Sequence, residues 1–231
     1  MKKRNILIAV TITTLLVAGL ISCKKDSGNP PTPAENGNTL ITIIFDSTCV
    51  SNKDSIRRSG KVTIHLSGKY RSTGTGDTIR FENYNAGGYT KSGIVIWSNV
   101  SKGDTLRWRR THSLTITSAD GDFWAHQGNY AIVQTEGINT PHNVLDNSFA
   151  LTGSSLLGSY NGQTSTNTIL VPLEKKAGCR NFQKGKMRVS GINHTGIVDF
   201  GYSINSSELC DNLASYNIDS SKKTYEIVLA H

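Results

Sequence analysis

The spacing of apolar residues constrains this chain more than any other feature of its sequence. From residue 40 onward the apolar residues recur with a period near two, where a helix would give about 3.6. In the segment 61–71, Val62, Ile64, Leu66 and Tyr70 alternate with polar residues. Because successive side chains of a strand point to opposite faces, this segment is predicted to be a long β-strand with one solvated face.

The segment 106–117 shows the same alternation. Leu106, Trp108, Leu114 and Ile116 share one face, while arginine, serine and threonine residues occupy the other. Shorter segments of this kind are separated by clusters of glycine, asparagine, aspartate and serine, which are typical of turns. Further strands are expected at residues 40–45, 78–84, 92–100, 129–135, 148–152, 168–173, 186–192, 195–203 and 224–229.

The short connections indicate how these strands are joined. After the N-terminal leader, no long stretch combines helical spacing with helix-forming residues. Parallel strands need crossover connections, usually helical, whereas antiparallel strands need only a turn. We therefore expect an all-β fold, either an antiparallel meander or a β-sandwich of long strands, forming one domain over residues 39–231.

Residues 1–22 have the layout of a lipoprotein signal peptide. Three basic residues precede an uncharged run from Ile6 to Leu20, which is shorter than the roughly 20 apolar residues of a bilayer span. The sequence Leu20-Ile21-Ser22-Cys23 resembles the lipobox of bacterial lipoproteins. That resemblance implies cleavage before Cys23 and attachment of acyl chains to its sulfur. The alternatives are an ordinary secretory peptide with an incidental cysteine, or an uncleaved anchor.

Residues 23–38 are predicted to be a lipidated, flexible and disordered tether. Three prolines, three asparagines and two glycines within residues 24–38 leave little apolar surface to bury. In many lipoproteins of Gram-negative bacteria, an aspartate directly after the lipidated cysteine favours retention in the inner membrane. Lys24 occupies that position here. We therefore expect an outer-membrane location, facing either the periplasm or the cell surface.

The charge balance bears on the partners. The formal net charge is +8, and three of the positive charges belong to the leader. No dense basic tract or nucleic-acid-binding motif follows, so nucleic acid is not an expected partner. The expected partners are the lipid bilayer, through acylated Cys23, and either a polysaccharide or another envelope protein.

The cysteine count agrees with export to an oxidising compartment. The chain has four cysteines, and lipidation of Cys23 leaves an odd number. That count allows at most one intramolecular disulfide and one spare thiol. We expect the disulfide between Cys179 and Cys210, which each lie beside turn-forming residues, and the sequence leaves the state of Cys49 open. The sequence contains no CxxC or HxxxH spacing, so neither a metal nor a cofactor is expected.

A set of short motifs follows a fixed order along the chain. They are Arg57-Arg58-Ser59-Gly60-Lys61 after Cys49, Trp108-Arg109-Arg110-Thr111, Ile169 to Leu173 before Cys179, Asp199-Phe200-Gly201, and Cys210-Asp211-Asn212. In this order they resemble a family of uncharacterised lipoproteins of the Bacteroidota, over most of the mature chain. The segment from Asp199 to Cys210 is longer here than in that family. The resemblance implies no activity, because no function is established for the family.

Two tryptophans suggest a binding hypothesis. Flat aromatic rings stack on the faces of sugar rings, and Trp97 and Trp124 are the tryptophans without a clear core position. They predict a carbohydrate-binding face as the alternative to a purely structural or binding role in the cell envelope. Packing within the β-domain is the other interpretation of both residues.

Arg110 and His112 interrupt the apolar face of the segment 106–117. If they are buried, they need partners, because an unpaired buried charge is costly. Three interpretations remain open. The strand face is exposed at this end, Arg110 pairs with a carboxylate such as Asp199, or the two residues form an anion site.

Three tripeptides of the form Asp-Ser/Thr-apolar resemble sites at which Bacteroidota O-glycosylate exported proteins. They place the modification at Ser55, Thr78 and Thr105. A turn aspartate followed by a threonine-rich strand gives the same pattern without any modification.

Nothing in the sequence predicts catalysis. No nucleophile elbow or cysteine-histidine signature is present, and the acidic residues of the mature chain are few and lie mostly in turns. Asp120-Gly121-Asp122 lacks the further oxygen ligands of a calcium loop and is expected to be a turn. We therefore expect a protein that is not an enzyme and has no catalytic residues.

Lipidation at Cys23 leads to the first testable prediction. Wild-type protein should enter the detergent phase and fractionate with the outer membrane, whereas Cys23→Ala should stay in the aqueous phase, because multiple acyl chains give stable anchoring. Protease treatment of intact cells then tells a surface-facing protein from a periplasmic one. If Cys23→Ala fractionates like the wild type, the lipobox assignment is wrong.

Overall fold

The computed structural model describes residues 38–47, 49–51, 55–159, 162–179, 181–191, 195–201, 210, 212–220 and 223–229. The predicted signal peptide, Cys23 and all but the last residue of the predicted tether lie outside the described residues. Within the described ranges, no helix is long and apolar enough to cross a membrane.

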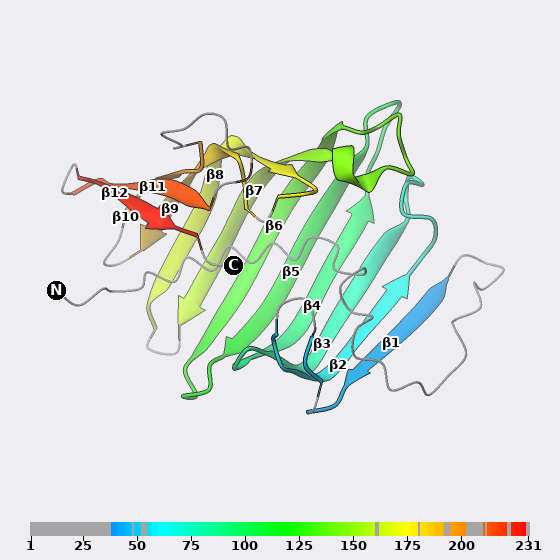
Figure 1. Ribbon diagram of the computed structural model, residues 1–231, viewed down its shortest axis with the longest axis horizontal. Coiled ribbons are helices and arrows are strands. Elements are labelled where there is room, and N and C mark those ends of the chain that lie inside the picture. The colour runs from blue at the N-terminus through cyan, green and yellow to red at the C-terminus, as the bar shows by residue number, and fades with distance from the viewer. Residues whose placement is uncertain are drawn as a thin grey trace.

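The described residues form twelve strands in one sheet, in which each strand pairs with its neighbours in the sequence. Every pairing is antiparallel, so the sheet is a meander that runs from β1 at one edge to β12 at the other (Figure 1). The strands are β1 (Thr39–Phe45), β2 (Arg58–Leu66), β3 (Gly76–Ala86), β4 (Tyr89–Asn99), β5 (Arg107–Thr117), β6 (Phe123–Glu136), β7 (Ser148–Ser159), β8 (Thr164–Lys176), β9 (Lys184–Gly191), β10 (Thr195–Asp199), β11 (Leu213–Ile218) and β12 (Thr224–Val228).

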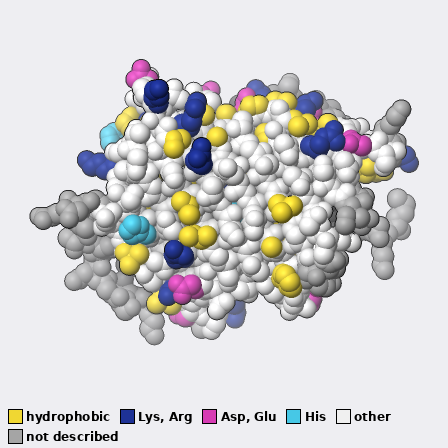
Figure 2. Space-filling model, turned by 180° about the vertical axis from the view of Figure 1, so that it is seen from behind, with side chains coloured by type: hydrophobic (Ala, Val, Ile, Leu, Met, Phe, Trp, Pro, Cys, Tyr) yellow, Lys and Arg dark blue, Asp and Glu magenta, His cyan; other side chains and the backbone are white. Residues whose placement is uncertain are grey.

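The two faces of the sheet differ in chemistry, as the alternation in sequence requires. On β5, Trp108 and Leu114 are buried, while Arg109 and Thr115 between and beside them are exposed. We call the face with Trp108 the inner face and the opposite one the outer face. Figure 2 views the molecule from behind, where most of the visible surface is backbone or side chains that are neither hydrophobic nor charged, and the apolar side chains are scattered. Such a surface suits contact with water.

Two apolar clusters cover much of the inner face. The first spans β5 to β11 and includes Trp108, Leu173 and Val198, which are almost fully buried. The second spans β1 to β5 and includes Val62 and Val95. Burying such side chains supplies the main free energy that favours folding of the sheet.

The fold is all-β, as predicted from the sequence, and the described strands form one antiparallel meander, the first of the two predicted arrangements. Several element bounds also differ from the prediction. Tyr70 lies in the turn after β2 and not in a strand, and its ring stacks on Trp108 with 4.9 Å between centroids. β6 and β7 are longer than expected, because their glycines sit inside the strands. β11 was not expected at all.

A disulfide joins Cys179 and Cys210, the pair favoured by the sequence, with 5.0 Å between their Cα atoms. It ties the turn after β8 to the approach to β11. No described cysteine is a free thiol, and Cys49 also belongs to a disulfide. The sequence left the state of Cys49 open, and the expectation of at most one intramolecular disulfide is wrong in this structure.

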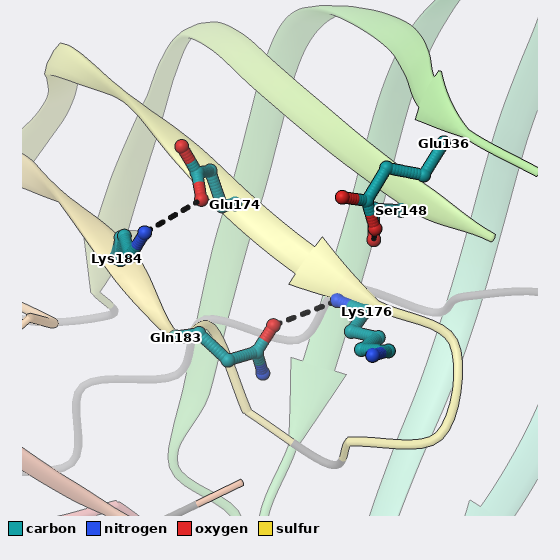
Figure 3. A network of polar contacts seen from close by, with 6 residues as sticks. All are labelled: Glu136, Ser148, Glu174, Lys176, Gln183 and Lys184. Carbon is teal, nitrogen blue, oxygen red and sulfur yellow. Dashed lines mark hydrogen bonds and ion pairs between the residues drawn. The ribbon is translucent and has the colours of Figure 1, made fainter. Parts of the chain in front are cut away.

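Polar contacts hold the strand ends around the Cys179 turn. Ser148 on β7 donates a hydrogen bond of 2.5 Å to the carboxylate of Glu136 on β6. The backbone N–H of Lys176 donates to the Gln183 side chain at 2.7 Å, and Lys184 lies 3.8 Å from Glu174 (Figure 3). These contacts link β6 to β7, and β8 to β9 and the residue that precedes β9.

The position of Trp108 leads to a prediction about stability. Trp108→Ala should lower the free energy of unfolding by about 3–5 kcal/mol, because it leaves a cavity in the larger cluster and removes the stacking partner of Tyr70. Thr115→Ala, on the outer face of the same strand, should change it by less than about 0.5 kcal/mol. Urea unfolding measures both, and equal losses would show that the two faces are not distinct.

Candidate anion-binding site on the inner face

Between the two apolar clusters, the inner face carries four side chains that are basic or can become so. They are Lys91 on β4, Arg110 and His112 on β5, and His126 on β6, and we call them the basic cluster. After burial, the charge of Arg110 is the largest cause that lowers the pKa values of Lys91, His112 and His126, so these three side chains lie close enough to Arg110 to interact with it. The cluster is a polar interruption of an otherwise apolar surface.

Arg110 is positioned by its neighbours in the ladder. Its Cα partners are Trp97 on β4 and Tyr130 on β6. The guanidinium carbon lies 5.7 Å from the centre of the Trp97 ring and 5.8 Å from that of Tyr130. Cation–π attraction of this kind orients the guanidinium, but it does not satisfy its N–H donors.

His112 occupies space that a glycine leaves open. It faces Gly128 on β6, where an added Cβ would lie 2.4 Å from the imidazole Cε1. The ring stacks nearly parallel to Tyr130, with centroids 5.9 Å apart, and meets His126 edge-on at 4.4 Å. Any larger residue at position 128 would displace the imidazole.

Burial without partners sets this cluster apart from an ordinary polar patch. Arg110, His112 and His126 are 2%, 5% and 4% exposed. Within the described part of the chain, Arg110 Nε and Nη2, both imidazole nitrogens of His112, and His126 Nδ1 have no hydrogen-bond partner. Each such group costs about 1–3 kcal/mol relative to a hydrogen-bonded one, and a charged group costs more.

The pKa values of the four side chains in the basic cluster are all lowered. Burial, the Arg110 charge and the other members lower the pKa of His112 to about 3. Burial and the charges of Arg110 and Lys91 lower the pKa of His126 to about 4. Burial lowers the pKa of Lys91 and of Arg110 as well. Both imidazoles are therefore neutral at pH 7, while the guanidinium keeps its charge.

The structure overturns two sequence-based interpretations of Arg110 and His112. Neither residue is exposed, because both are buried. Asp199 does not pair with Arg110, since its carboxylate lies 3.0 Å from Lys186 Nζ. Asp77 on β3 faces the same side but lies across Trp97 from Arg110, so the two strand backbones are about 10 Å apart.

The tryptophans that suggested glycan binding lie beside this cluster. Trp97 and Trp124 are half-buried on the inner face, and Trp97 packs against both apolar clusters. Trp124 lies 6.4 Å from the ring of Tyr89, which is 43% exposed. Sequence reasoning missed His126, Lys91 and Gly128. His126 shares its strand face with Trp124 and Tyr130, a signal hidden because the predicted strand began at residue 129.

The other predicted sites are spread over the surface. Ser55 and Thr105 are exposed, whereas Thr78 is half-buried within β3. Asp120-Gly121-Asp122 forms the turn between β5 and β6, where the N–H of Ser118 donates to the carbonyl of Asp122. Gly121 adopts a φ of +89°, which favours glycine. The turn was expected, and the described residues contain no group of three metal-ligating side chains.

Comparisons with known proteins give no relative of this chain: no family model, no curated protein and no solved structure matches it.

Acid should destabilise the protein through the two histidines. Their folded-state pKa values lie below 6.5, so the unfolded chain binds protons first as the pH falls. Above about pH 6.5 both histidines are neutral in the folded and the unfolded chain, so their titration does not change the free energy of unfolding. Below that pH, protonation of the unfolded chain lowers the free energy of unfolding, and the loss grows as the pH falls toward the folded-state pKa values. Between about pH 7 and pH 4, the free energy of unfolding of His112→Gln should fall by roughly 2–3 kcal/mol less than that of the wild type.

Urea unfolding at both pH values measures this difference. His65→Gln is the matched control, because His65 is exposed on the outer face of β2. The same reduction in both variants would assign the acid sensitivity to groups outside the basic cluster.

Proposed function

We propose that this protein is a lipid-anchored binding protein of the bacterial outer membrane, not an enzyme, and that the inner face of its sheet holds the ligand. The observation that carries the proposal is the unpartnered basic cluster on that face. A purely structural sheet gains nothing from burying polar groups without hydrogen bonds, whereas a binding site keeps them for its ligand.

The anchor is supported by the sequence. The lipobox ends at Cys23, and the similarity to lipoproteins of the Bacteroidota points to the same compartment. The first strand begins at Thr39, so the stretch between Cys23 and the sheet is long enough to give the domain reach from the membrane. The β-domain then presents its faces to the periplasm or to the outside.

The sulfur of Cys23 has two competing fates. The chain has four cysteines, Cys179 and Cys210 are bonded to each other, and Cys49 is disulfide-bonded. One sulfur cannot carry both a thioether to lipid and an intrachain disulfide. The mass of the mature chain before and after reduction decides which fate Cys23 has.

A second candidate function is carbohydrate binding at the edge of the basic cluster. Trp124 and Tyr89 form an aromatic pair there, and part of the Tyr89 ring is open to solvent. A pair of rings at this spacing offers a platform for a sugar face, and neighbouring polar groups supply hydrogen bonds. A polysaccharide of the envelope or surroundings fits such a platform.

Tryptophan fluorescence tests the carbohydrate proposal. Polysaccharide from a broad panel should quench or shift the emission of wild-type protein, and Trp97→Ala and Trp124→Ala should weaken binding by about tenfold or more. Phe123→Ala should bind like the wild type, because Phe123 adjoins Trp124 in sequence but faces outward. No response across the panel would remove carbohydrate as the ligand. Co-purification with an envelope complex would then favour another protein as the partner.

A further inference from the structure

We propose that the basic cluster binds a tetrahedral oxyanion, the phosphate or sulfate group of a ligand held on the inner face. This inference rests on the proposed function, because it takes the inner face as the ligand face. It adds the chemical class of the ligand and the residues that hold it: Arg110, His112, His126 and Lys91.

The guanidinium of Arg110 supplies the first contact. Its unpartnered atoms, Nε and Nη2, form one edge of the planar group. That edge presents two parallel N–H donors, the arrangement that binds two oxygens of one oxyanion. Trp97 and Tyr130 flank the guanidinium on either side and hold it in place.

Further donors come from the neighbouring strands. His112 shares β5 with Arg110, and the ring of His126 on β6 meets that of His112 edge-on. Lys91 on β4 has its Nζ 5.3 Å from the centre of the Phe81 ring, and its charge contributes to lowering the pKa of both imidazoles. The two imidazole planes are inclined by 65°, so their nitrogens do not lie in the plane of a single carboxylate. A phosphate or sulfate group, with oxygens in three dimensions, matches donors arranged in this way better than a flat carboxylate does.

The charge of the cluster argues against a metal ion in the same place. Two imidazoles alone can ligate zinc or copper, but burial and then the positive charge of Arg110 lower the pKa of both histidines. A site that repels a proton on its imidazoles also repels a divalent cation. No acidic residue appears among the groups that shift these pKa values, so an anion is the missing partner.

Anion binding should be coupled to proton uptake. The titratable groups near the two histidines are Lys91 on β4, Arg110 on β5 and Tyr130 on β6. On β3, the acidic residue on the inner face is Asp77, which pairs with Trp97, the β4 partner of Arg110. A bound anion offsets the positive charge and raises the pKa of the imidazoles. Affinity should then rise as the pH falls, because protonated imidazoles donate two hydrogen bonds where neutral ones donate one.

Titration calorimetry on the full mature chain in non-ionic detergent tests the site, at constant ionic strength. Inorganic sulfate is the main probe, since its charge does not change over the pH range, with inorganic phosphate and glucose 6-phosphate beside glucose as further probes. Sulfate should bind about tenfold more tightly at about pH 6 than at pH 8, the change expected when binding takes up about half a proton on average over these two pH units. Equal affinity at both pH values would overturn the role of the histidines.

Variants separate a specific site from general attraction. Arg110→Gln and His126→Gln should each weaken sulfate binding by about tenfold or more. Arg109→Gln should leave it unchanged, because Arg109 is the next residue of the same strand but is exposed on the outer face. Circular dichroism checks that each variant folds. If Arg110→Gln does not fold, the sulfate affinity of His126→Gln tests the site. Equal weakening in Arg109→Gln would overturn the proposal.

The outcomes also distinguish this inference from the proposed function. Binding of sulfate and glucose 6-phosphate but not of glucose, with no response to the polysaccharide panel, supports the anion site and removes neutral carbohydrate as the ligand. Binding of glucose as tight as that of glucose 6-phosphate overturns the anion site and leaves the carbohydrate proposal standing. Absence of sulfate binding at either pH overturns the anion site directly.

Discussion

The structure depends on burying one face of a single sheet. Twelve antiparallel strands satisfy their backbone hydrogen bonds laterally, but this pairing alone does not remove apolar side chains from water. Trp108 lies almost fully buried near the middle of the order of strands, where it contacts the ring of Tyr70 from a turn and that of Phe149 from β7. The turns, strand lengths and bulges keep such side chains on the inner face of the sheet.

The basic cluster works against this constraint. It places an arginine, two histidines and a lysine in the surface that the sheet buries, and leaves several of their donors without partners among the described residues. The local packing accommodates them closely: Gly128 leaves space for His112, and Trp97 and Tyr130 flank Arg110. Geometry so specific, at a cost in folding free energy, is typical of a surface kept for binding.

Much of the fold could be predicted from the sequence, because strand phase depends only on neighbouring residues. The alternation around Trp108 gave the correct inner and outer faces of β5, and the short turns gave the antiparallel connections. The bounds of β6 and β7 were not predictable in this way, since internal glycines such as Gly128 and Gly153 resemble turn residues locally. Gly153 sits in a bulge opposite Tyr130, with a φ of +129°.

The sequence by itself determined the class of fold, the phase of the principal strands and the polar residues that interrupt the apolar face. Only the tertiary structure decided which residues meet, because the hydrogen-bond register between strands fixes the neighbours of each side chain. It placed Asp199 on β10, five strands away from Arg110, and brought the ring of His126 on β6 against that of His112. It also placed Lys91 on β4 near enough for its charge to lower the pKa of both histidines. A pair of isolated polar residues in the sequence thus became a four-residue cluster in the folded protein.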